Sequence, residues 1–594
     1  MVSGKTFANS STEKRVKFLV IFFFLLGALL LWRLFHWQIV AAGELAGIAK
    51  SQQQVRTKVP AKRGSILASD NFPLVSSKQS FLLWAQPKKI SEPEKIAKAL
   101  APLLISDYEE TEASPSGRTQ GEIITDEEER IKEVLAKKDA AWVPVKRKVS
   151  RETKSKIEAL GIANVGFDEE EDRSYPEGSM SAHLLGFVGK DAAGEDRGYF
   201  GLEGYYDLTL SGASGKKTWE KDALGNPILL GDFWEISALD GATLKTHIDR
   251  SIQFIAEKHL KEGLEKYGAS RGMVVVARPQ DGAILAMASL PAYSPSRFTL
   301  FKQEEFINPV IGESFEPGSI FKVLVMSAAL DAGVVTADEK CDACSGPRRI
   351  GEYTIKTWNE KYYPDSTATE IIEHSDNIGM VWTAEKLGRD KLLEYLDKFG
   401  IGKATNIDLQ GEAAPALRDK DKWASIDLAT AGFGQGIAVT AIQMVRAVGA
   451  IANGGMLAAP QVVDKVITQI KEHDVPPQLG EQVISKETAG KITEMMIKAI
   501  ENGEAKWAKP KGFKVAGKTG TAQIPIAGHY DPEKTIASFI GFASPSNPKF
   551  VMLVSLWEPK SSPWGSETAA PLWFSIARDL FPYMGIKPEG GVGG

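Results

Sequence analysis

The first long hydrophobic stretch of the chain lies close to its N-terminus. Residues Phe18 to Trp32 read FLVIFFFLLGALLLW, and basic residues between positions 14 and 17 precede them. About 20 apolar residues in a helix span the core of a bilayer, so the pattern predicts a single membrane anchor over residues 16–40. The basic flank predicts a cytoplasmic tail, residues 1–15, with the rest of the chain outside. A cleaved signal peptide is the alternative, which the length of the apolar run disfavours.

A different pattern begins near residue 245. Apolar residues recur on one helical face between Arg250 and Tyr267, and two apolar runs then flank a Pro-Gln-Asp-Gly turn in residues 273–289. These segments predict a helix and a hairpin. Near the C-terminus, TIASFIGFA and KFVMLVSLW flank SPSNP and predict another hairpin, and SETAAPLWFSIARDLFPYM predicts a closing helix. Helices at both ends with strands between them indicate an α+β domain, residues 245–586, whose helices pack on an antiparallel sheet.

The segment between these two regions is less regular. Residues 41–240 are mixed and rich in predicted loops. Within them, residues 106–130 are polar and acidic and predict a solvated, partly mobile insertion. The last residues, 587–594, are rich in glycine and predict a flexible tail.

Composition narrows the classes of function. The 594 residues are too many for one hydrophobic core, so we expect at least two folded domains. The net charge of −5 gives no reason to expect nucleic acid as a partner. Seven histidines without zinc spacing predict neither a catalytic metal nor a cofactor. The only cysteines, Cys341 and Cys344, form either a disulfide in an oxidising compartment or two free thiols.

Two motifs in the chain match known patterns in the wrong context. Residues 512–519 fit the nucleotide-binding pattern G-x-x-x-x-G-K-[ST], but a glycine and then Pro525 follow where that motif requires a helix. The segment is therefore predicted to be a strand. GASRG, residues 268–272, fits the nucleophile elbow of hydrolases but lies between a helix and a strand, the reverse of the required order. We interpret it as a glycine turn at a helix end.

Three further stretches carry the candidate chemistry. EPGSIFKVLVMSAAL places Ser319 three residues before Lys322, and residues with this spacing share one face of a helix. A serine in the first helical turn also lies near free backbone N–H groups, which stabilise developing negative charge. EHSDNIGM contains Ser375-Asp376-Asn377, and residues 518–521 read K-T-G-T. Each motif alone is commonplace, but S-x-x-K, S-D-N and K-T-G in this order specifically indicate a serine acyl-enzyme site.

With these motifs the chain resembles the penicillin-binding proteins, and more closely the class B, monofunctional D,D-transpeptidases. The resemblance covers nearly all of the chain beyond the anchor. Residues 173–189 and 201–215 resemble motifs of that family's N-terminal pedestal, and FGQGIAVTAIQM and IANGG resemble landmarks of its transpeptidase domain. ASFIGFASPSNPKFVMLVSLWEP and AAPLWFSIARDL are most similar to the division-specific branch. In the first pedestal motif, RGSILASDN, Ala68 and Ser69 replace an acid–base pair, so a pedestal salt bridge is expected to be missing.

The resemblance implies a fold and an activity. The fold is a transmembrane helix, an elongated pedestal similar to the dimerisation domain over residues 41–240, and a transpeptidase domain with a five-stranded antiparallel sheet flanked by helices. The activity is cross-linking of peptidoglycan stem peptides in septal wall synthesis, with β-lactams as inhibitors. The implied location is the inner (cytoplasmic) membrane, with the catalytic domain outside. No cofactor is implied.

The resemblance also implies roles for individual residues. Ser319 is the nucleophile, Lys322 its base, and Ser375 a proton relay, while Asn377 holds the substrate backbone. The substrate's terminal carboxylate binds the hydroxyls of Thr519 and Thr521, with added charge from Lys518. Gly520 allows close approach of the substrate, and the backbone N–H groups of Ser319 and Thr521 form the oxyanion hole.

Alternatives and partners follow from the same comparison. A β-lactamase or D,D-carboxypeptidase does not explain some 200 residues of pedestal. An elongation-specific transpeptidase, or a scaffold or sensor that β-lactams acylate without turnover, remains an alternative. No glycosyltransferase domain fits before residue 245, so we expect the chain to work with a membrane glycosyltransferase of the SEDS type and with other division proteins.

Overall fold

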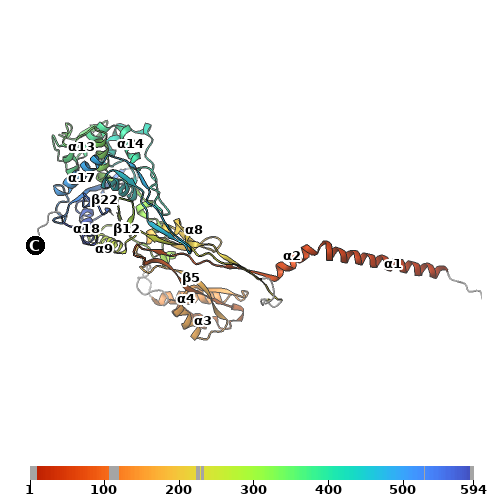
Figure 1. Ribbon diagram of the computed structural model, residues 1–594. Helices are drawn as coiled ribbons and strands as arrows, with labels where there is room; N and C mark the ends of the chain where they lie inside the picture. Colours follow the sequence, from red (N-terminus) through yellow and green to blue (C-terminus); the bar gives the residue numbers. More distant parts are fainter. Residues whose placement is uncertain (1–9, 106–119, 223–227, 229–232, 527–528, 589–594) are drawn as a thin grey trace, which may run out of the picture. The chain divides into compact units, whose positions relative to one another are not determined.

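The computed structural model describes the chain except residues 1–9, 106–119, 223–227, 229–232, 527–528 and 589–594 (Figure 1). By its internal contacts the chain divides into two units. The first comprises residues 1–61 and 213–240, and the second comprises residues 62–212 and 241–594. Each unit is described by itself.

The first unit combines the predicted anchor with a small sheet. Helix α1 (Ser10–Phe35) continues through a short π-helical turn, η1 (His36–Val40), into α2 (Ala42–Gln53). The segment Thr12–Val40 is long and apolar enough to cross a membrane, and none of its most apolar window is buried. Strands β1 (Gln54–Val59), β8 (Gly215–Glu220) and β9 (Phe233–Ile236) form an antiparallel sheet in the order β1-β8-β9.

The second unit begins with a seven-stranded mixed sheet. Its strands run in the order β19-β18-β10-β2-β3-β4, and β5 pairs with β3. The only parallel pair in this sheet, within the described residues, is β10 with β2. The strands are β2 (Ile66–Leu67), β3 (Pro73–Ala85), β4 (Val143–Val149), β5 (Val165–Ser174), β10 (Thr243–Thr246), β18 (Val463–Ile467) and β19 (Glu472–Asp474).

Three helices cover one end of this sheet, and one of them includes part of the segment that was predicted to be a solvated insertion. Helices α3 (Pro93–Ile105), α4 (Gln120–Leu135) and α5 (Arg151–Ala159) enclose an apolar cluster with β3, β4 and β5. Residues 120–130, the second half of the segment predicted to be a solvated, partly mobile insertion, form the first part of α4. None of residues 121–130 is buried, and Ile131 and Leu135, which follow the segment, pack in that cluster. The first half, residues 106–119, lies outside the described residues.

A group of buried charges joins the elements of the pedestal region. Arg63 binds Glu203 at 2.6 Å and Asp207 at 2.8 Å, and Arg173 binds the other carboxylate oxygen of Glu203 at 2.6 Å. Glu203 is completely buried, yet both of its oxygens are paired. Ala68, at a position where the family usually has a charge, is also completely buried. Arg63 therefore takes part in an ion-pair network with residues of α7 (Gly201–Tyr205) and α8 (Asp207–Ser211), whereas Ala68 and Ser69 carry no charge with which to form the bridge that was expected to be missing.

A five-stranded antiparallel sheet forms the centre of the C-terminal part, as predicted. Its order is β12-β11-β23-β22-β21. Both predicted hairpins are present, one from β11 (Arg271–Ala277) and β12 (Ile284–Leu290), the other from β22 (His529–Ala543) and β23 (Val551–Trp557). The edge strand β21 (Val515–Ile526) carries the K-T-G residues, so the nucleotide-binding interpretation of this stretch is excluded.

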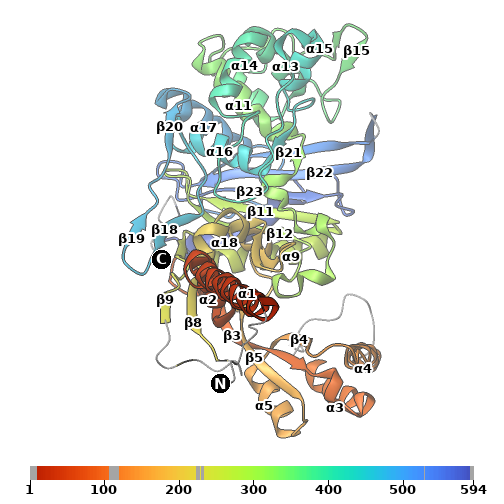
Figure 2. The same ribbon diagram turned by 90° about the vertical axis from the view of Figure 1, so that its right-hand side faces the viewer.

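Helices cover both faces of this sheet (Figure 2). Alternate residues of β11 contribute to different clusters: Val274 and Val276 pack with α9 (Arg250–Tyr267) and α18 (Ala569–Tyr583), whereas Met273 and Val275 pack with the helices on the other face. Those helices include α11 (Lys322–Asp331), α16 (Ala441–Ala452) and α17 (Lys486–Glu501). Gly268 ends α9 with a positive φ of 64°, which confirms the glycine-turn interpretation of GASRG.

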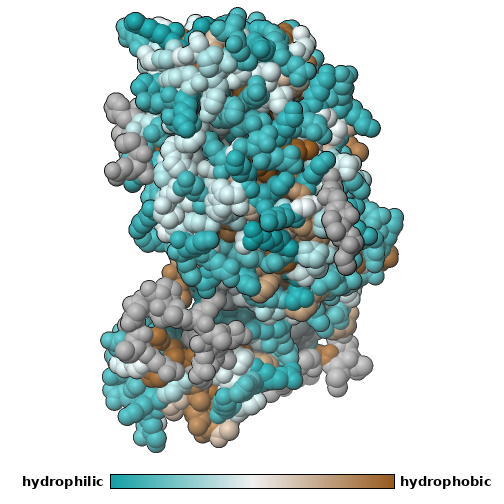
Figure 3. Space-filling view, turned by 90° about the vertical axis from the view of Figure 1, so that its left-hand side faces the viewer, coloured by the Kyte–Doolittle hydropathy of each residue, from teal (hydrophilic) through white to brown (hydrophobic). Residues whose placement is uncertain are grey.

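Shorter elements complete the described chain. The outer face of the second unit drawn in Figure 3 is mostly hydrophilic, with hydrophobic residues scattered over it. The remaining elements are η2 (Pro87–Lys89), α6 (Ala182–Leu185), β6 (Phe187–Lys190), β7 (Asp196–Tyr199), η3 (Pro295–Leu300), η4 (Gln303–Phe306), α10 (Pro309–Gly312), β13 (Ser314–Phe315), η5 (Gly318–Phe321), β14 (Arg348–Ile350), β15 (Tyr353–Ile355), α12 (Ala368–Glu373), α13 (Asn377–Leu387), α14 (Arg389–Lys398), η6 (Lys420–Lys422), α15 (Ser425–Ala431), β16 (Val439–Thr440), β17 (Met456–Ala458) and β20 (Leu479–Gln482).

Candidate active site

The candidate nucleophile lies on a tight turn in front of a buried helix. Ser319 belongs to the 3-10 turn η5, and Lys322 is the first residue of α11. Gly318 has a φ of 55° and donates its N–H to the carbonyl of Gly434 at 3.0 Å. A Cβ atom on Gly434 would lie 2.1 Å from the oxygen of Gly318, so the FGQG stretch needs glycine there. The backbone at Gly434 thus packs against the η5 turn and fixes its position.

Lys322 is completely buried and points to the S-D-N loop. Its Nζ donates to the carbonyl of Ser375 at 2.6 Å, to Oδ1 of Asn377 at 2.8 Å and to the Ser375 hydroxyl at 3.3 Å. Among the described residues no hydrogen bond joins Lys322 to the Ser319 hydroxyl. The hydroxyl that the amine contacts is that of the relay serine, Ser375. The motifs S-x-x-K and S-D-N are therefore brought together by direct contact.

The S-D-N loop is a turn between two helices. Ser375 adopts a φ of 55° between α12 and α13, and Asp376 caps α13 by accepting a hydrogen bond from the backbone of Ile378 at 2.8 Å. Asn377 donates from Nδ2 to the carbonyl of Lys356 at 3.1 Å. One N–H of that amide group is therefore already engaged, and the second is available to a substrate. Because of this turn, the side chains of Ser375 and Asn377 both contact Lys322.

The K-T-G strand passes directly in front of the nucleophile turn. A Cβ atom on Gly520 would lie 2.9 Å from the side chain of Ile320, and a Cβ on Gly318 would lie 2.9 Å from the carbonyl of Thr521. Glycine at both positions therefore permits the close approach. This contact places the backbone around Ser319 beside that of Thr521, the two predicted members of the oxyanion hole.

The side chains of this strand divide between the interior and the surface. Lys518 is 2% exposed, whereas Thr519 and Thr521 are partly exposed. Nζ of Lys518 lies 3.4 Å from the Thr519 hydroxyl, and the Thr521 hydroxyl accepts a hydrogen bond from the N–H of Gly565 at 2.9 Å. Two hydroxyls and one buried amine thus line the edge of the sheet beside Ser319.

Burial sets the charge state of both lysines. Burial lowers the pKa of Lys322 well below its usual value, the nearby charge of Lys518 lowers it further, and Asp376 and Glu504 oppose this. Burial likewise lowers the pKa of Lys518 to about 8, against the opposing effect of Glu504. Burial also raises the pKa of Asp376, against the opposing effects of the backbone N–H of Ile378 and the charge of Lys322. A neutral amine at Lys322 is the form that this environment favours.

Several residues near the motifs carry no signal in the sequence. Glu504, in the connection between α17 and β21, acts on both lysines although it lies 14 residues before Lys518. Trp358 and Trp564 pack edge to face with ring centroids 5.0 Å apart. They come from loops about 200 residues apart in the sequence, so only the fold brings them together.

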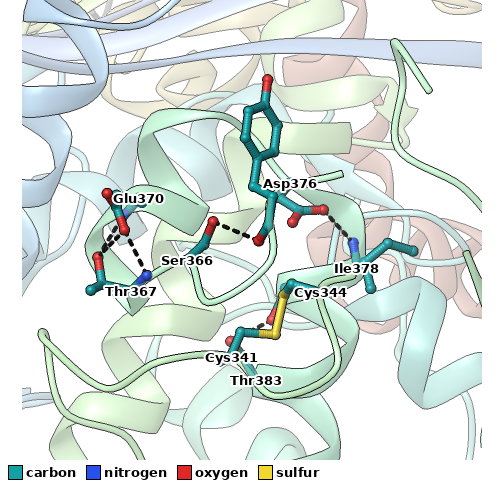
Figure 4. The surroundings of a disulfide bond; sticks show 10 residues. Cys341, Cys344, Ser366, Thr367, Glu370, Asp376, Ile378 and Thr383 are labelled. Atoms are coloured by element: carbon teal, nitrogen blue, oxygen red, sulfur yellow. Dashed lines mark hydrogen bonds between the residues drawn. A yellow bond between two sulfur atoms is a disulfide. The ribbon is translucent and has the colours of Figure 1, made fainter. Parts of the chain in front are cut away.

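The two cysteines are joined by a disulfide bond. Both are buried, and the backbone N–H of Cys341 donates to the carbonyl of Ser366 at 2.8 Å. Figure 4 shows the bond in the surroundings of Asp376, in the S-D-N loop, and of Ile378, which follows that loop. The structure therefore confirms the disulfide and excludes the alternative of two free thiols. Among the described residues no group of histidine, cysteine and acidic side chains is suited to hold a metal ion.

Comparison with known proteins agrees with this geometry. Residues 272–581 match the family model of the penicillin-binding protein transpeptidase domain, and residues 58–246 match that of the penicillin-binding protein dimerisation domain. Stage V sporulation protein D of Bacillus subtilis is 32% identical over 98% of this chain and 88% of its own length. Peptidoglycan D,D-transpeptidase FtsI of Escherichia coli is 29% identical over 95% of this chain and 90% of its own.

Solved structures show the same fold. A peptidoglycan synthetase from Bifidobacterium adolescentis superposes with a TM-score of 0.69 at 24% identity, covering 91% of this chain and 99% of that one. Penicillin-binding protein 3 of Mycobacterium tuberculosis, in complex with aztreonam, has a TM-score of 0.67 at 24% identity and covers 90% and 98%. With both family models matched in order and the three motifs brought together around Lys322, the chain belongs to the class B penicillin-binding proteins, the family with a dimerisation domain followed by a transpeptidase domain.

Proposed function

We propose that the protein is a peptidoglycan D,D-transpeptidase that acts through an acyl-enzyme on Ser319. The observation that carries the proposal is the buried Lys322, which has no carboxylate salt bridge among the described residues and which contacts the S-D-N loop directly behind the nucleophile turn. A solvated lysine at an accidental S-x-x-K match would have no reason to be buried. Buried amines of lowered pKa are typical of catalytic bases.

The contacts of Lys322 are consistent with a neutral amine. A neutral amine has two N–H groups for the two closest acceptors, the carbonyl of Ser375 and Oδ1 of Asn377, which lie within 2.8 Å of Nζ, and in that form the hydroxyl of Ser375 at 3.3 Å faces the lone pair. The lone pair is then left to accept a proton. Ser319 Oγ attacks the carbonyl carbon between the two D-alanines of a donor stem, and its proton passes to Lys322. A proton returns through Ser375 to the leaving nitrogen, so the C–N bond breaks and D-alanine departs.

The strand β21 supplies the remaining functions. Backbone N–H groups of Ser319 and Thr521 bind the oxyanion, and the hydroxyls of Thr519 and Thr521 bind the terminal carboxylate of the donor together with protonated Lys518. Asn377 uses its second N–H to hold the donor backbone. The acyl group then passes to an amine of a second stem peptide, which restores Ser319.

Mass spectrometry after treatment with a fluorescent penicillin tests the proposal. The drug should add its mass to a peptide that contains Ser319, and Ser319→Ala should abolish the label. Ser314→Ala is a matched control, because Ser314 is an exposed serine five residues away. A label that persists in Ser319→Ala would refute the assignment. Release of D-alanine from a soluble donor distinguishes an enzyme with turnover from a sensor that is only acylated.

We also propose that the enzyme serves septal rather than lateral wall synthesis. The similarity to Escherichia coli FtsI and the division-like C-terminal motifs support this role. Depletion in the native organism should block septation and leave growth of the cylinder or the cell periphery intact. Normal septa in cells of altered shape would instead assign the protein to elongation.

The proposed location is the inner membrane, crossed once, with the N-terminus in the cytoplasm, the pedestal over residues 41–240 and the transpeptidase domain over residues 245–586 outside. The apolar helix Thr12–Val40 and its basic N-terminal flank support this orientation. The proposed partner is a multi-spanning SEDS-type glycosyltransferase. Phe233 and Trp234, each 63% exposed on β9 of the first unit, are available for such contact.

Replacement of residues 1–40 by an unrelated single-span helix tests the partner proposal. Co-purification with the glycosyltransferase should fall, and Phe233→Ser with Trp234→Ser should weaken it further. Unchanged co-purification and growth in both variants would leave the anchor as a tether only. Protease digestion of spheroplasts tests the orientation, because an external transpeptidase domain must be cleaved.

A further inference from the structure

A cavity of about 300 Å³ lies in the C-terminal part of the second unit and is not used by the proposed donor reaction. Two tryptophans, Trp358 and Trp507, a tyrosine and a histidine form its aromatic walls. Tyr363 and His374 stack with ring centroids 4.2 Å apart. The volume falls at the lower end of the range for small-ligand sites.

The cavity is lined by residues that neighbour or contact parts of the catalytic site. His374, which lines it, directly precedes Ser375. Trp358 packs against Trp564, whose neighbour Gly565 donates to the hydroxyl of Thr521. Glu504, also in its lining, is close enough to act on the charge of both catalytic lysines. The cavity therefore lies beside the S-D-N loop, and its wall is connected through Trp564 and Gly565 to the K-T-G strand.

The charged side chains that line the cavity make few contacts with one another. Glu504 and Lys506 have no salt bridge within the part of the chain that the structure describes, and Glu373 accepts one hydrogen bond, from Nδ2 of Asn502 at 3.1 Å. Two carboxylates, one lysine amine and several aromatic faces thus surround the space. This combination suits a ligand with an ammonium group on an aliphatic stem and a carboxylate nearby.

We infer that this cavity receives the acceptor stem, that is, the peptide whose diamino acid supplies the attacking amine. The inference rests on the proposed function. By microscopic reversibility the acceptor nitrogen must approach along the path by which the leaving nitrogen departs, and Ser375 stands on that path beside the cavity. The carboxylates attract the amine in its ammonium form, which is the form of an alkyl amine at neutral pH.

The chemical step balances as an aminolysis. The ammonium loses one proton to solvent and becomes the nucleophile. Its nitrogen attacks the acyl carbonyl carbon, a C–N bond forms, and the C–O bond to Ser319 breaks. The second amine proton passes through Ser375 to Oγ of Ser319. No co-reactant beyond the acyl-enzyme and the amine is needed.

The test separates the two half-reactions of the full-length protein in detergent. The donor is a soluble acyl-D-Ala-D-lactate ester, and the acceptors are tripeptide stems that end in L-lysine or meso-diaminopimelate with a free amine. In Trp507→Ala the acceptor concentration for half-maximal aminolysis should rise about tenfold, because one cation–π wall is lost. Penicillin acylation should stay within about twofold of wild type, and Trp507→Phe should restore aminolysis. Trp142→Ala, which removes a 45% exposed tryptophan outside the cavity, is the matched control.

Two unreactive probes sharpen the result. An acceptor peptide with a trimethylated amine keeps the charge and should inhibit aminolysis, whereas an acetylated one should inhibit at least about tenfold more weakly. Unchanged aminolysis in Trp507→Ala, or equal loss of acylation and aminolysis, would overturn the acceptor assignment. Failure of the wild type to bind penicillin at all would instead overturn the proposed function.

Discussion

The protein buries positive side chains in two regions. In one region they are paired with carboxylates, and in the other, among the described residues, they are not. In the pedestal region Arg63 and Arg173 share the buried Glu203, and Asp207 completes the group. In the catalytic region Lys322 and Lys518 are equally buried, but none of the described salt bridges involves either lysine. Burial acts to lower the pKa of Arg63 and of both lysines, yet the carboxylates raise that of Arg63 above its usual value while those of the lysines fall.

The difference indicates which cluster supports the fold and which supports the chemistry. A paired charge keeps its proton and fixes the elements that supply it. An unpaired buried amine is destabilising as a cation and is therefore ready to release a proton, which is what a base must do. The catalytic cluster thus trades stability for reactivity, and the following predictions test that distinction.

The largest effect is expected on stability in the pedestal. Glu203→Gln leaves both arginines without their shared carboxylate, and breaking a buried pair costs about 3–5 kcal/mol. The free energy of unfolding of the extracytoplasmic part, measured by urea denaturation, should fall accordingly. Penicillin acylation of the protein that remains folded should stay near the wild-type rate. If Glu203→Gln instead lost acylation at unchanged stability, the assignment of a structural role to the pedestal cluster would be wrong.

The next effect is expected on catalysis. Lys322→Ala removes the base and should slow penicillin acylation about 10²-fold or more, without the loss of stability that is expected for Glu203→Gln. Stopped-flow or gel-based labelling measures the rate. Lys386→Ala serves as the control, because that lysine is a partly exposed member of a surface ion pair with Glu339. Near wild-type acylation in folded Lys322→Ala would remove the lysine from the mechanism.

A third prediction concerns pH and stability. The pKa of Lys518 is about 8 in the folded protein, below its ordinary value of 10.5. Between these values the unfolded chain binds the proton more tightly, so the penalty for burying Lys518 is fully present below about pH 8 and is relieved as pH rises. Relative to Lys518→Met, the wild type should gain about 2 kcal/mol in unfolding free energy between pH 8 and 10. If the unfolding free energies of the two proteins change with pH in the same way, the lowered pKa of Lys518 is contradicted.

The smallest effect is a displacement of the pH profile. Acylation should decline above about pH 8, where Lys518 loses the charge that binds the substrate carboxylate. Glu504→Gln removes a carboxylate that raises the pKa of both lysines. Both limbs of the profile of kcat/KM should therefore move to lower pH. A profile that keeps its position would show that Glu504 does not act on the catalytic lysines.

Local patterns in the sequence determined much of the architecture. The α9 helix, both hairpins, the closing helix and the apolar N-terminal helix were predicted, because burial on one face imposes a period that single segments display. For residues 106–130 the sequence predicted a solvated insertion and did not indicate the helix α4, because α4 has few apolar residues, and those become informative only when α3 and β4 pack against them.

The sequence by itself also identified the catalytic residue types, since S-x-x-K, S-D-N and K-T-G are short motifs whose chemistry requires those side chains. Only the tertiary structure decided that Lys322 contacts Ser375 and Asn377, that Glu504 acts on both lysines, and that Trp358 meets Trp564. These relations join loops and strands distant in the chain. Their energies depend on distance and burial, which a linear pattern does not contain.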